Sequence, residues 1–178
     1  MLIPRQTVPS LELPMLDHGK FNLAHEQPEN FSLVVFFRGL HCPLCVKYLK
    51  ELGALLPQLK ERGVKVVAIS SDDEGRAREM AAKVNVPDLR FGYALPLGMA
   101  RSWGLYISTG KGKTSAGVEE PGLFAEPGVF LIRPDQTLYY GAVQTMPFAR
   151  PSFQDLLMAI DFAITKDYPA RGEYTGSV

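Results

Sequence analysis

The sequence predicts an α/β fold in which a central mixed sheet is flanked by helices. Three observations support this fold class. Apolar runs of strand length alternate with segments whose apolar residues recur at helical spacing, as in parallel strands joined by helical crossovers. A later pair of apolar runs flanks a short polar turn, which is typical of antiparallel strands. The length of 178 residues fits one domain with a full hydrophobic core.

A short hairpin is expected before the sheet. Residues 11–13 and 20–23 alternate apolar and polar side chains around an Asp17-His18-Gly19 turn, a pattern typical of two antiparallel strands. The first strand of the sheet itself is predicted at residues 33–37, because this uninterrupted apolar run resembles strands that are covered on both faces. These segments together predict a central sheet with an N-terminal β-hairpin extension.

An amphipathic helix is predicted to follow this strand. The apolar residues between positions 48 and 59 recur at helical spacing, and Gly63 suits the C-terminal end of the helix. Residues 64–70 predict a second buried strand. Residues 71–74 carry short oxygen-bearing side chains that suit the start of another helix, which ends near Val84. This alternation predicts parallel strands with right-handed crossovers.

The following segment is less regular. Residues 91–95 predict a short strand, and residues 96–103 predict a short helix. Residues 108–122 are rich in glycine and poor in large apolar side chains, so we expect a mobile surface loop there. Loops of that length are often functional. The apolar runs at 129–132 and 138–143 flank a short polar turn and predict an antiparallel hairpin.

The last predicted element is a helix that begins at Ser152. Ser152 and Asp155 resemble a capping box, and the apolar residues from there to Ile164 form one stripe. No repeat and no linker divides the chain, so residues 1–165 are predicted to form a single domain. The polar residues 166–178 are expected to be a flexible C-terminal tail.

Composition and charge exclude several classes of function. Nineteen basic and nineteen acidic residues give a formal net charge of zero, so the electrostatic signature of a nucleic-acid-binding protein is missing. We expect no membrane partner, since no window approaches the length of an apolar membrane span and the first residues do not form a secretory signal. Both cysteines fall in one Cys-Pro-Leu-Cys segment rather than in a framework of spread pairs, which favours a reducing compartment. The protein is therefore expected in the cytoplasm.

The two cysteines, Cys42 and Cys45, are the candidate catalytic residues. They follow a buried strand and open a helix, where unpaired backbone N–H groups and the helix dipole favour a thiolate over a thiol. We expect Cys42 to be the more strongly activated, because it lies at the cap beside His41 and close to Arg38, while Cys45 lies one turn further and deeper. One of the two is expected to be ionised at neutral pH and reachable by solvent.

Two other interpretations of the cysteine pair are weaker. A structural zinc site needs four ligands, and beyond the cysteines only His18, His25 and His41 could contribute, without a second pair at zinc spacing. Inert packing is disfavoured because the pair lies at a strand-to-helix junction. Accordingly, we expect no metal and no cofactor.

Three other side chains are candidates for a role beside the cysteines. His41 is either a partner of the thiolate or a solvated surface histidine. Arg150 either closes over the thiols or solvates a turn. Pro127 stands before a predicted strand, where a cis bond would expose a neighbouring backbone edge to a docking partner and a trans bond would make it a plain edge proline.

The order of these elements looks like the thioredoxin fold, and residues 34–45, 66–72 and 130–132 resemble the peroxiredoxin-like branch of the AhpC/TSA family. The likeness runs from about Pro9 to Ile164. It implies a thioredoxin-like fold and a thiol-based antioxidant oxidoreductase. Arg38, His41 and Pro127 would then assist substrate binding or stabilise the thiolate.

The sequence departs from the family motif P-x-x-x-T-x-x-C at several positions. Arg38 occupies the proline position, Cys42 the threonine position and Cys45 the position of the cysteine that attacks peroxide. Pro127 stands where the resemblance would place an assisting arginine. Two mechanisms therefore stay open: Cys42 attacks a substrate disulfide and Cys45 resolves the product, or Cys45 becomes a sulfenic acid that Cys42 condenses with.

The resemblance also implies partners. The substrate would be a hydroperoxide or a disulfide, the reductant a thioredoxin-type protein or glutathione, and a homodimer would be in keeping with the family. An alternative from another class is a non-catalytic redox sensor or binding module, in which a disulfide within the cysteine pair changes how residues 108–122 engage a partner.

Overall fold

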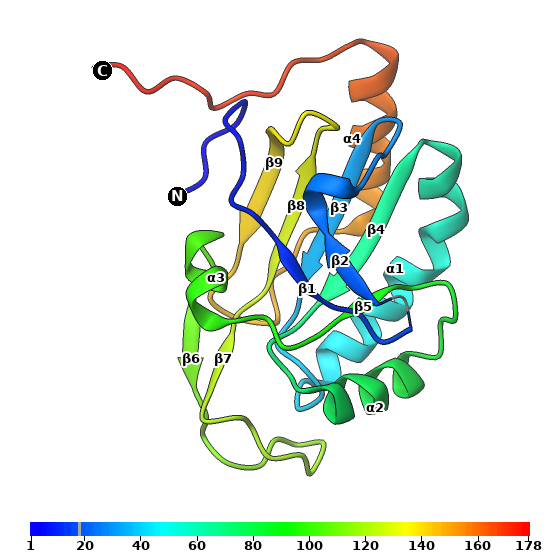
Figure 1. The fold of residues 1–178 in the computed structure, drawn as a ribbon, viewed down its shortest axis with the longest axis vertical. Helices are drawn as coiled ribbons and strands as arrows, with labels where there is room; N and C mark the ends of the chain where they lie inside the picture. The colour runs from blue at the N-terminus through cyan, green and yellow to red at the C-terminus, as the bar shows by residue number, and fades with distance from the viewer. Residues whose placement is uncertain (18) are drawn as a thin grey trace.

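The fold is built on a central five-stranded mixed sheet with the order β5-β4-β3-β8-β9 (Figure 1). A computed structural model describes residues 1–17 and 19–178. The strands are β3 (Phe31–Phe36), β4 (Val64–Ile69), β5 (Phe91–Gly92), β8 (Gly128–Ile132) and β9 (Leu138–Val143). The first three run parallel, whereas β8 pairs antiparallel with β3 and β9 pairs antiparallel with β8. In the central register, Val34 lies between Val67 and Phe130. The predicted mixed sheet is confirmed.

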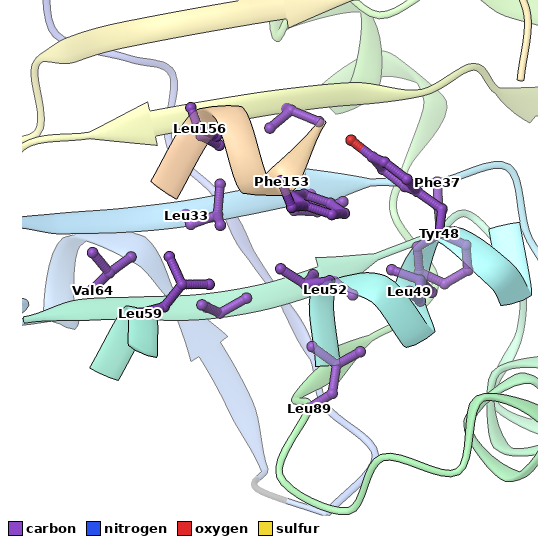
Figure 2. Packing of buried hydrophobic residues seen from close by; sticks show 14 of the residues in the cluster. Leu33, Phe37, Tyr48, Leu49, Leu52, Leu59, Val64, Leu89, Phe153 and Leu156 are labelled. Carbon is purple, nitrogen blue, oxygen red and sulfur yellow. The ribbon is translucent and has the colours of Figure 1, made fainter. Parts of the chain in front are cut away.

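One face of the sheet is covered by the helices α1 (Pro43–Glu61) and α4 (Phe153–Thr165), with α2 (Glu74–Val84) packed against α1 (Figure 1). Alternate side chains of the strands point to this face, as the two-residue period of a strand requires. They meet the apolar stripe of α1 in one cluster (Figure 2). Its members include Leu33, Leu49, Leu52, Leu59, Val64, Phe153 and Leu156.

The opposite face packs against β1 (Glu12–Pro14), β2 (Lys20–Asn22), a 3-10 turn at Leu23–His25 and the short helix α3 (Leu97–Ser102). The strands β1 and β2 form the expected antiparallel hairpin, although His18 in its predicted turn lies outside the described residues. A cluster of three aromatic rings fills this layer. The rings of Phe36 and Phe130 lie 5.5 and 5.2 Å from that of Trp103, which is fully buried.

The segment predicted as a mobile surface loop, residues 108–122, lies at the surface, but its first two residues belong to a strand and further backbone pairing follows. The strands β6 (Ile107–Thr109) and β7 (Leu123–Ala125) pair antiparallel, and an isolated bridge joins Lys113 to Glu119 further out. Backbone pairing of this kind needs no large apolar side chains, so composition alone does not reveal it. The segment from Ile107 to Ala125 is called the hairpin arm below.

The first half of the predicted tail, residues 166–178, contacts the rest of the protein. The Arg5 Nε donates a hydrogen bond to the Ala170 carbonyl at 2.9 Å, and the Tyr139 hydroxyl donates one to the Tyr168 carbonyl at 2.9 Å. Ala170 is buried. The tail therefore lies against the N-terminal segment and β9. Across residues 1–17 and 19–178, no helix combines the length and the apolar character that crossing a bilayer would require.

Candidate active site

The cysteine pair lies at the junction of β3 and α1, as the sequence predicts. The connecting loop is anchored to the C-terminal end of β4, because the Asp72 Oδ2 accepts a hydrogen bond from the Leu40 backbone N–H at 2.7 Å. Gly39 makes this approach possible: its φ is +134°, and a Cβ there would lie 2.5 Å from the Asp72 carboxylate. Cys42 then occupies the N-cap of α1 and Pro43 its first turn.

The two sulfur atoms lie 2.7 Å apart and form no disulfide. The pKa of Cys42 is lowered to about 6, chiefly because the Cys45 thiol donates a hydrogen bond to its sulfur, with Arg150 and the Cys45 backbone N–H acting in the same direction against burial. The pKa of Cys45 is raised well above its ordinary value, first by burial and then by the same hydrogen bond. At neutral pH this arrangement pairs a thiolate on Cys42 with a thiol on Cys45.

Arg150 closes over the thiols, which decides between the two alternatives left by the sequence. Its Nη2 lies 3.8 Å from the Cys42 Sγ, its guanidinium stacks 4.7 Å from the centre of the Tyr48 ring, and its Nε donates to the Pro147 carbonyl at 2.7 Å. The Tyr48 hydroxyl in turn donates to the Pro151 carbonyl at 2.6 Å. Residues 144–151, called the Arg150 segment below, therefore lie over the cysteine pair.

The expectation that one thiol is reachable by solvent is wrong for this conformation. Cys42 is 2% exposed and Cys45 is 0% exposed, because the Arg150 segment covers the cap of α1. A pocket of about 290 Å³ lies directly outside this cover and is lined by Leu44, Tyr48, Phe148 and Arg150 among others. A reagent can reach the Cys42 sulfur only when the Arg150 segment moves.

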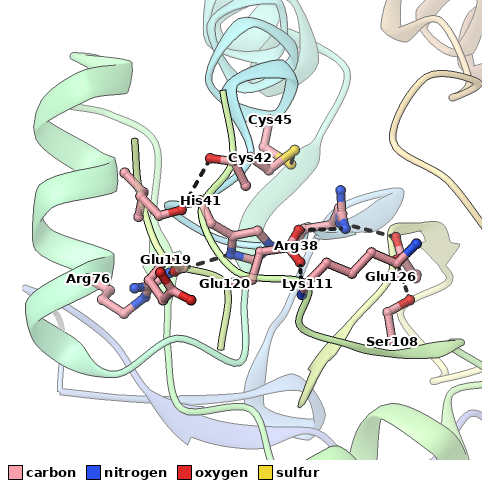
Figure 3. Close-up of polar contacts among 12 residues, drawn as sticks. Arg38, His41, Cys42, Cys45, Arg76, Ser108, Lys111, Glu119, Glu120 and Glu126 are labelled. Carbon is pink, nitrogen blue, oxygen red and sulfur yellow. Dashed lines mark hydrogen bonds and ion pairs between the residues drawn. The ribbon is translucent and has the colours of Figure 1, made fainter. Parts of the chain in front are cut away.

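Arg38 faces the hairpin arm rather than the cysteines alone (Figure 3). Its Nη2 lies 3.4 Å from Glu120 Oε1, its Nε lies 3.4 Å from Glu126 Oε2, and its guanidinium stacks 4.7 Å from the centre of the Phe124 ring. Its positive charge still lowers the pKa of Cys42, as the smallest of the contributions to that shift. Arg38 thus joins the cysteine pair to a group of acidic residues.

His41 is fully buried near Arg76 (Figure 3). Its ring packs 4.6 Å from that of Phe124, and its Nδ1 lies 3.5 Å from the Arg76 Nη2. Burial lowers the pKa of His41 to about 4, so the imidazole is neutral at pH 7. The interpretation as a solvated surface histidine is wrong, and a neutral ring offers no positive charge to a thiolate.

Pro127 links β7 to β8 and is buried. The Glu126–Pro127 bond is trans, since residues 1–17 and 19–178 contain no cis peptide bond. The Pro127 carbonyl accepts a hydrogen bond from the Gln144 backbone N–H at 3.0 Å, so this stretch of backbone is already paired within the protein. A cis bond would have exposed a neighbouring backbone edge to a docking partner. With the trans bond, Pro127 does not expose such an edge.

Several residues of the site escape sequence reasoning. Asp72 and Asp73 both suit a helix cap, yet only Asp73 caps α2, while Asp72 turns inward to the Leu40 N–H and to Arg76 Nε at 2.9 Å. Glu120 and Glu126 come from the distant hairpin arm and its end. Their sequence signal is acidic character inside the predicted functional loop, for Glu120, and just after it, for Glu126. Within residues 1–17 and 19–178, no group of three or more His, Cys, Asp or Glu side chains is placed to hold a metal ion.

Residues 4–141 match the sequence model of the AhpC/TSA family. No curated protein matches the chain.

Solved structures support the same fold. A peroxiredoxin 6 of Arenicola marina is similar with a TM-score of 0.74 and 18% identity, over 94% of this chain and 76% of that one. The peroxidoxin BcpB of Mycobacterium tuberculosis is similar with a TM-score of 0.71 and 19% identity, over 92% and 99%. The reduced Prx3 of Vibrio vulnificus, solved in complex with H2O2, is similar with a TM-score of 0.69 and 16% identity, over 90% and 99%. The predicted thioredoxin-like fold is confirmed.

Proposed function

The chain belongs to the AhpC/TSA family and is an oxidoreductase, and from this premise we propose that it reduces hydroperoxides with Cys42 as the attacking thiolate and Cys45 as the resolving thiol. One observation carries this assignment. The Cys42 sulfur receives hydrogen bonds from the Cys45 thiol and from Arg150, and its pKa lies near 6. Cys45 is the donor in that pair and is more deeply buried. The charge therefore lies on the outer sulfur.

The chemistry proceeds in two balanced steps. The Cys42 thiolate attacks the terminal oxygen of the hydroperoxide, the O–O bond breaks, and the departing alkoxide takes a proton to leave as an alcohol or as water. Cys42 is now a sulfenic acid. The Cys45 sulfur attacks it, a Cys42–Cys45 disulfide forms, and the Cys45 proton leaves with the sulfenic oxygen as water. Arg150 favours the first step by stabilising the thiolate.

This assignment reverses the order that the family motif implies. By position in the motif, Cys45 would attack peroxide and Cys42 would resolve. Against that order, burial and the hydrogen bond from its own proton raise the pKa of Cys45, and a thiol is a much weaker nucleophile than a thiolate. The position of Cys42 at the N-cap of α1 and the nearby Arg150 guanidinium support Cys42 as the first nucleophile.

Size supports a hydroperoxide over a protein disulfide. With Cys42 2% exposed beneath the Arg150 segment, a small peroxide needs only a slight opening of that segment, whereas a protein disulfide needs the whole segment to leave. Thiol–disulfide exchange remains the second candidate function, because a Cys-x-x-Cys pair at a helix N-terminus suits it equally. Cys42 would attack first in that reaction too.

Single serine variants test the assignment. We expect Cys45→Ser to consume one equivalent of H2O2 and to form a sulfenic acid on Cys42 that dimedone traps, and we expect Cys42→Ser to react only at the background rate of a buried thiol. A sulfenic acid on Cys45 in Cys42→Ser would assign the attack to Cys45 instead. Reduction of insulin that is faster than reduction of H2O2 would favour disulfide exchange.

Turnover requires a reductant for the disulfide. We propose a thioredoxin-type protein or glutathione, in keeping with a cytoplasmic location, and a homodimer as the assembled form. Steady-state consumption of H2O2 with either reductant would exclude a sensor or binding module as the sole role. Reversible oxidation without turnover would favour that module. Sedimentation of the reduced and oxidised protein tests the dimer.

A further inference from the structure

We propose that Glu120 is a positioning residue for Cys42: it binds the Arg38 guanidinium at the hairpin arm and so limits the positive charge that Arg38 offers to the Cys42 sulfur. This inference deepens the proposed function and rests on Cys42 as the nucleophile. It gives the hairpin arm, far from Cys42 in sequence, control over the reactivity of the thiolate.

Glu120 is held at both carboxylate oxygens. Oε1 lies 3.4 Å from the Arg38 Nη2, and Oε2 accepts a hydrogen bond from the Lys111 backbone N–H at 2.7 Å (Figure 3). Its side chain is 10% exposed, and that of Arg38 is 17% exposed. Because water screens this ion pair poorly, the charge on each partner strongly affects the other.

Arg38 has a second carboxylate partner that keeps it in place. The Glu126 Oε2 lies 3.4 Å from the Arg38 Nε, and the other oxygen of Glu126 accepts a hydrogen bond from the Ser108 hydroxyl at 2.6 Å. The Phe124 ring lies against the guanidinium. Removing the charge of Glu120 therefore leaves Arg38 anchored by Glu126 and Phe124, while one of its two carboxylate partners no longer carries a negative charge.

The groups that lower the pKa of Cys42, one neutral thiol and two cations, come from three directions. Cys45 lies on α1, Arg150 lies in the Arg150 segment, and Arg38 lies in the loop before α1. Of the two cations, Arg38 has two carboxylates, those of Glu120 and Glu126, beside its guanidinium. The neutral His41 contacts Arg76, the partner of Asp72. In the described part of the chain, Glu120 and Glu126 are the acidic groups in contact with the Arg38 guanidinium.

A movement of the hairpin arm could change the positive charge that Arg38 offers to Cys42. Its outer residues, including Lys111, Lys113 and Glu119, are exposed, whereas Glu120 faces inward. A movement of the arm that withdraws Glu120 would leave more uncompensated positive charge beside Cys42. The thiolate would then persist to lower pH and be present in a larger fraction there.

The variants Glu120→Gln, Glu120→Asp and Glu119→Gln test the proposal. Glu119 is the matched control, because its backbone carbonyl, not its carboxylate, contacts Arg76. In the fully reduced protein, we expect Glu120→Gln to shift the pH profile of Cys42 alkylation, and of thiolate absorbance at 240 nm, downward by roughly half a unit. The thiolate fraction below the midpoint would rise about threefold. Glu119→Gln should retain the profile of the parent protein, and Glu120→Asp should lie between the two.

A second measurement shows whether Glu120 acts through Arg38. In an Arg38→Met background, Glu120→Gln should shift the profile by less than half as much as in the parent protein. An unchanged or upward shift in Glu120→Gln, or an equal shift in both backgrounds, would overturn the inference. Alkylation needs no peroxide. A protein whose profile shifts as expected but which does not reduce hydroperoxide would therefore refute the proposed function and leave this inference standing.

Discussion

The two sides of the cysteine pair are built differently. On one side, the hairpin arm and the start of α2 contact Arg38 and His41 through a buried network of ion pairs, hydrogen bonds and ring contacts. On the other side, the Arg150 segment is held by the side chains of Arg150 and Tyr48 and by the hydrogen bond from the Gln144 backbone N–H to the Pro127 carbonyl. Its outer residues project into solvent, and Phe148 is 77% exposed.

This difference gives the two sides separate roles: one maintains the structure around Cys42, and the other controls whether reagents can reach its sulfur. Buried ion pairs and hydrogen bonds are costly to disturb, so the network side acts as a fixed wall. A segment with few contacts opens locally at a small cost in free energy. The Arg150 segment therefore sets when Cys42 is reachable, and the network side sets how its charge is balanced. The predictions below test this division in order of decreasing effect.

The largest expected effect is on the fixed wall. Asp72→Ala removes the acceptor of the Leu40 N–H and the partner of Arg76, both at a buried carboxylate. We expect a loss of about 3 kcal/mol in the free energy of unfolding, measured by denaturant titration of the reduced protein. The exposed Asp88→Ala is the control and should lose less than about 0.5 kcal/mol. A loss below about 1 kcal/mol in Asp72→Ala would contradict a fixed wall.

The wall should also fail in acid because of His41. Its pKa is lowered from 6.5 to about 4 in the folded protein, so between these values the unfolded chain binds a proton that the native protein does not. The stabilisation is complete above pH 6.5 and is lost as the pH falls through 4, with a slope of up to about 1.4 kcal/mol per pH unit. In His41→Phe, the free energy of unfolding should change less steeply with pH between 6.5 and 4. An equal slope in the variant and the parent protein would show that His41 is not the cause of the acid sensitivity.

A smaller effect is expected on the side of the Arg150 segment. Arg150→Met keeps an apolar stem against Tyr48 but removes the charge beside the Cys42 Sγ. We expect the pKa of Cys42 to rise by about one unit, so that the thiolate fraction at pH 5 falls about tenfold. Absorbance at 240 nm measures it. The free energy of unfolding should change by less than about 1 kcal/mol, and a larger loss would mean that this side is structural too.

The smallest effect is expected from Tyr48→Phe. Burial raises the pKa of Tyr48, so its hydroxyl stays protonated and serves as a donor to the Pro151 carbonyl. Loss of this hydrogen bond should destabilise the fold by about 1 kcal/mol or less. Because the population of the open Arg150 segment rises exponentially with the free energy lost, Cys42 should be alkylated up to about fivefold faster at constant pH. An unchanged rate would show that Tyr48 does not hold the segment closed.

Local sequence patterns predicted most elements of the fold. The strands β3, β4, β8 and β9 and the helices α1, α2 and α4 all follow from hydrophobic spacing and caps, which are properties of neighbouring residues. The hairpin arm was not predicted as a hairpin, because its strands pair through backbone groups and leave no apolar period. The contacts of Ala170 could not be predicted either, since they depend on Arg5 at the opposite end of the chain.

In the candidate site, too, some features follow from local sequence and others depend on tertiary packing. The position of Cys42 at a helix cap depends on local sequence, and so does the expectation that it is the more acidic thiol. The contact of Arg38 with Glu120 spans 82 positions, and which of Asp72 and Asp73 turns inward depends on the loop that faces them. Such pairings are set by tertiary packing, so no local pattern indicates them.

The complete burial of Cys45 bears on how the protein withstands an excess of oxidant. Any oxidising molecule that enters meets the outer sulfur first, so irreversible damage in the form of sulfinic or sulfonic acid should collect on Cys42 while the inner cysteine remains unmodified. Inactivation would then be confined to a single sulfur atom, and tandem mass spectrometry of the peptide that carries both cysteines should find two or three added oxygens on Cys42 alone.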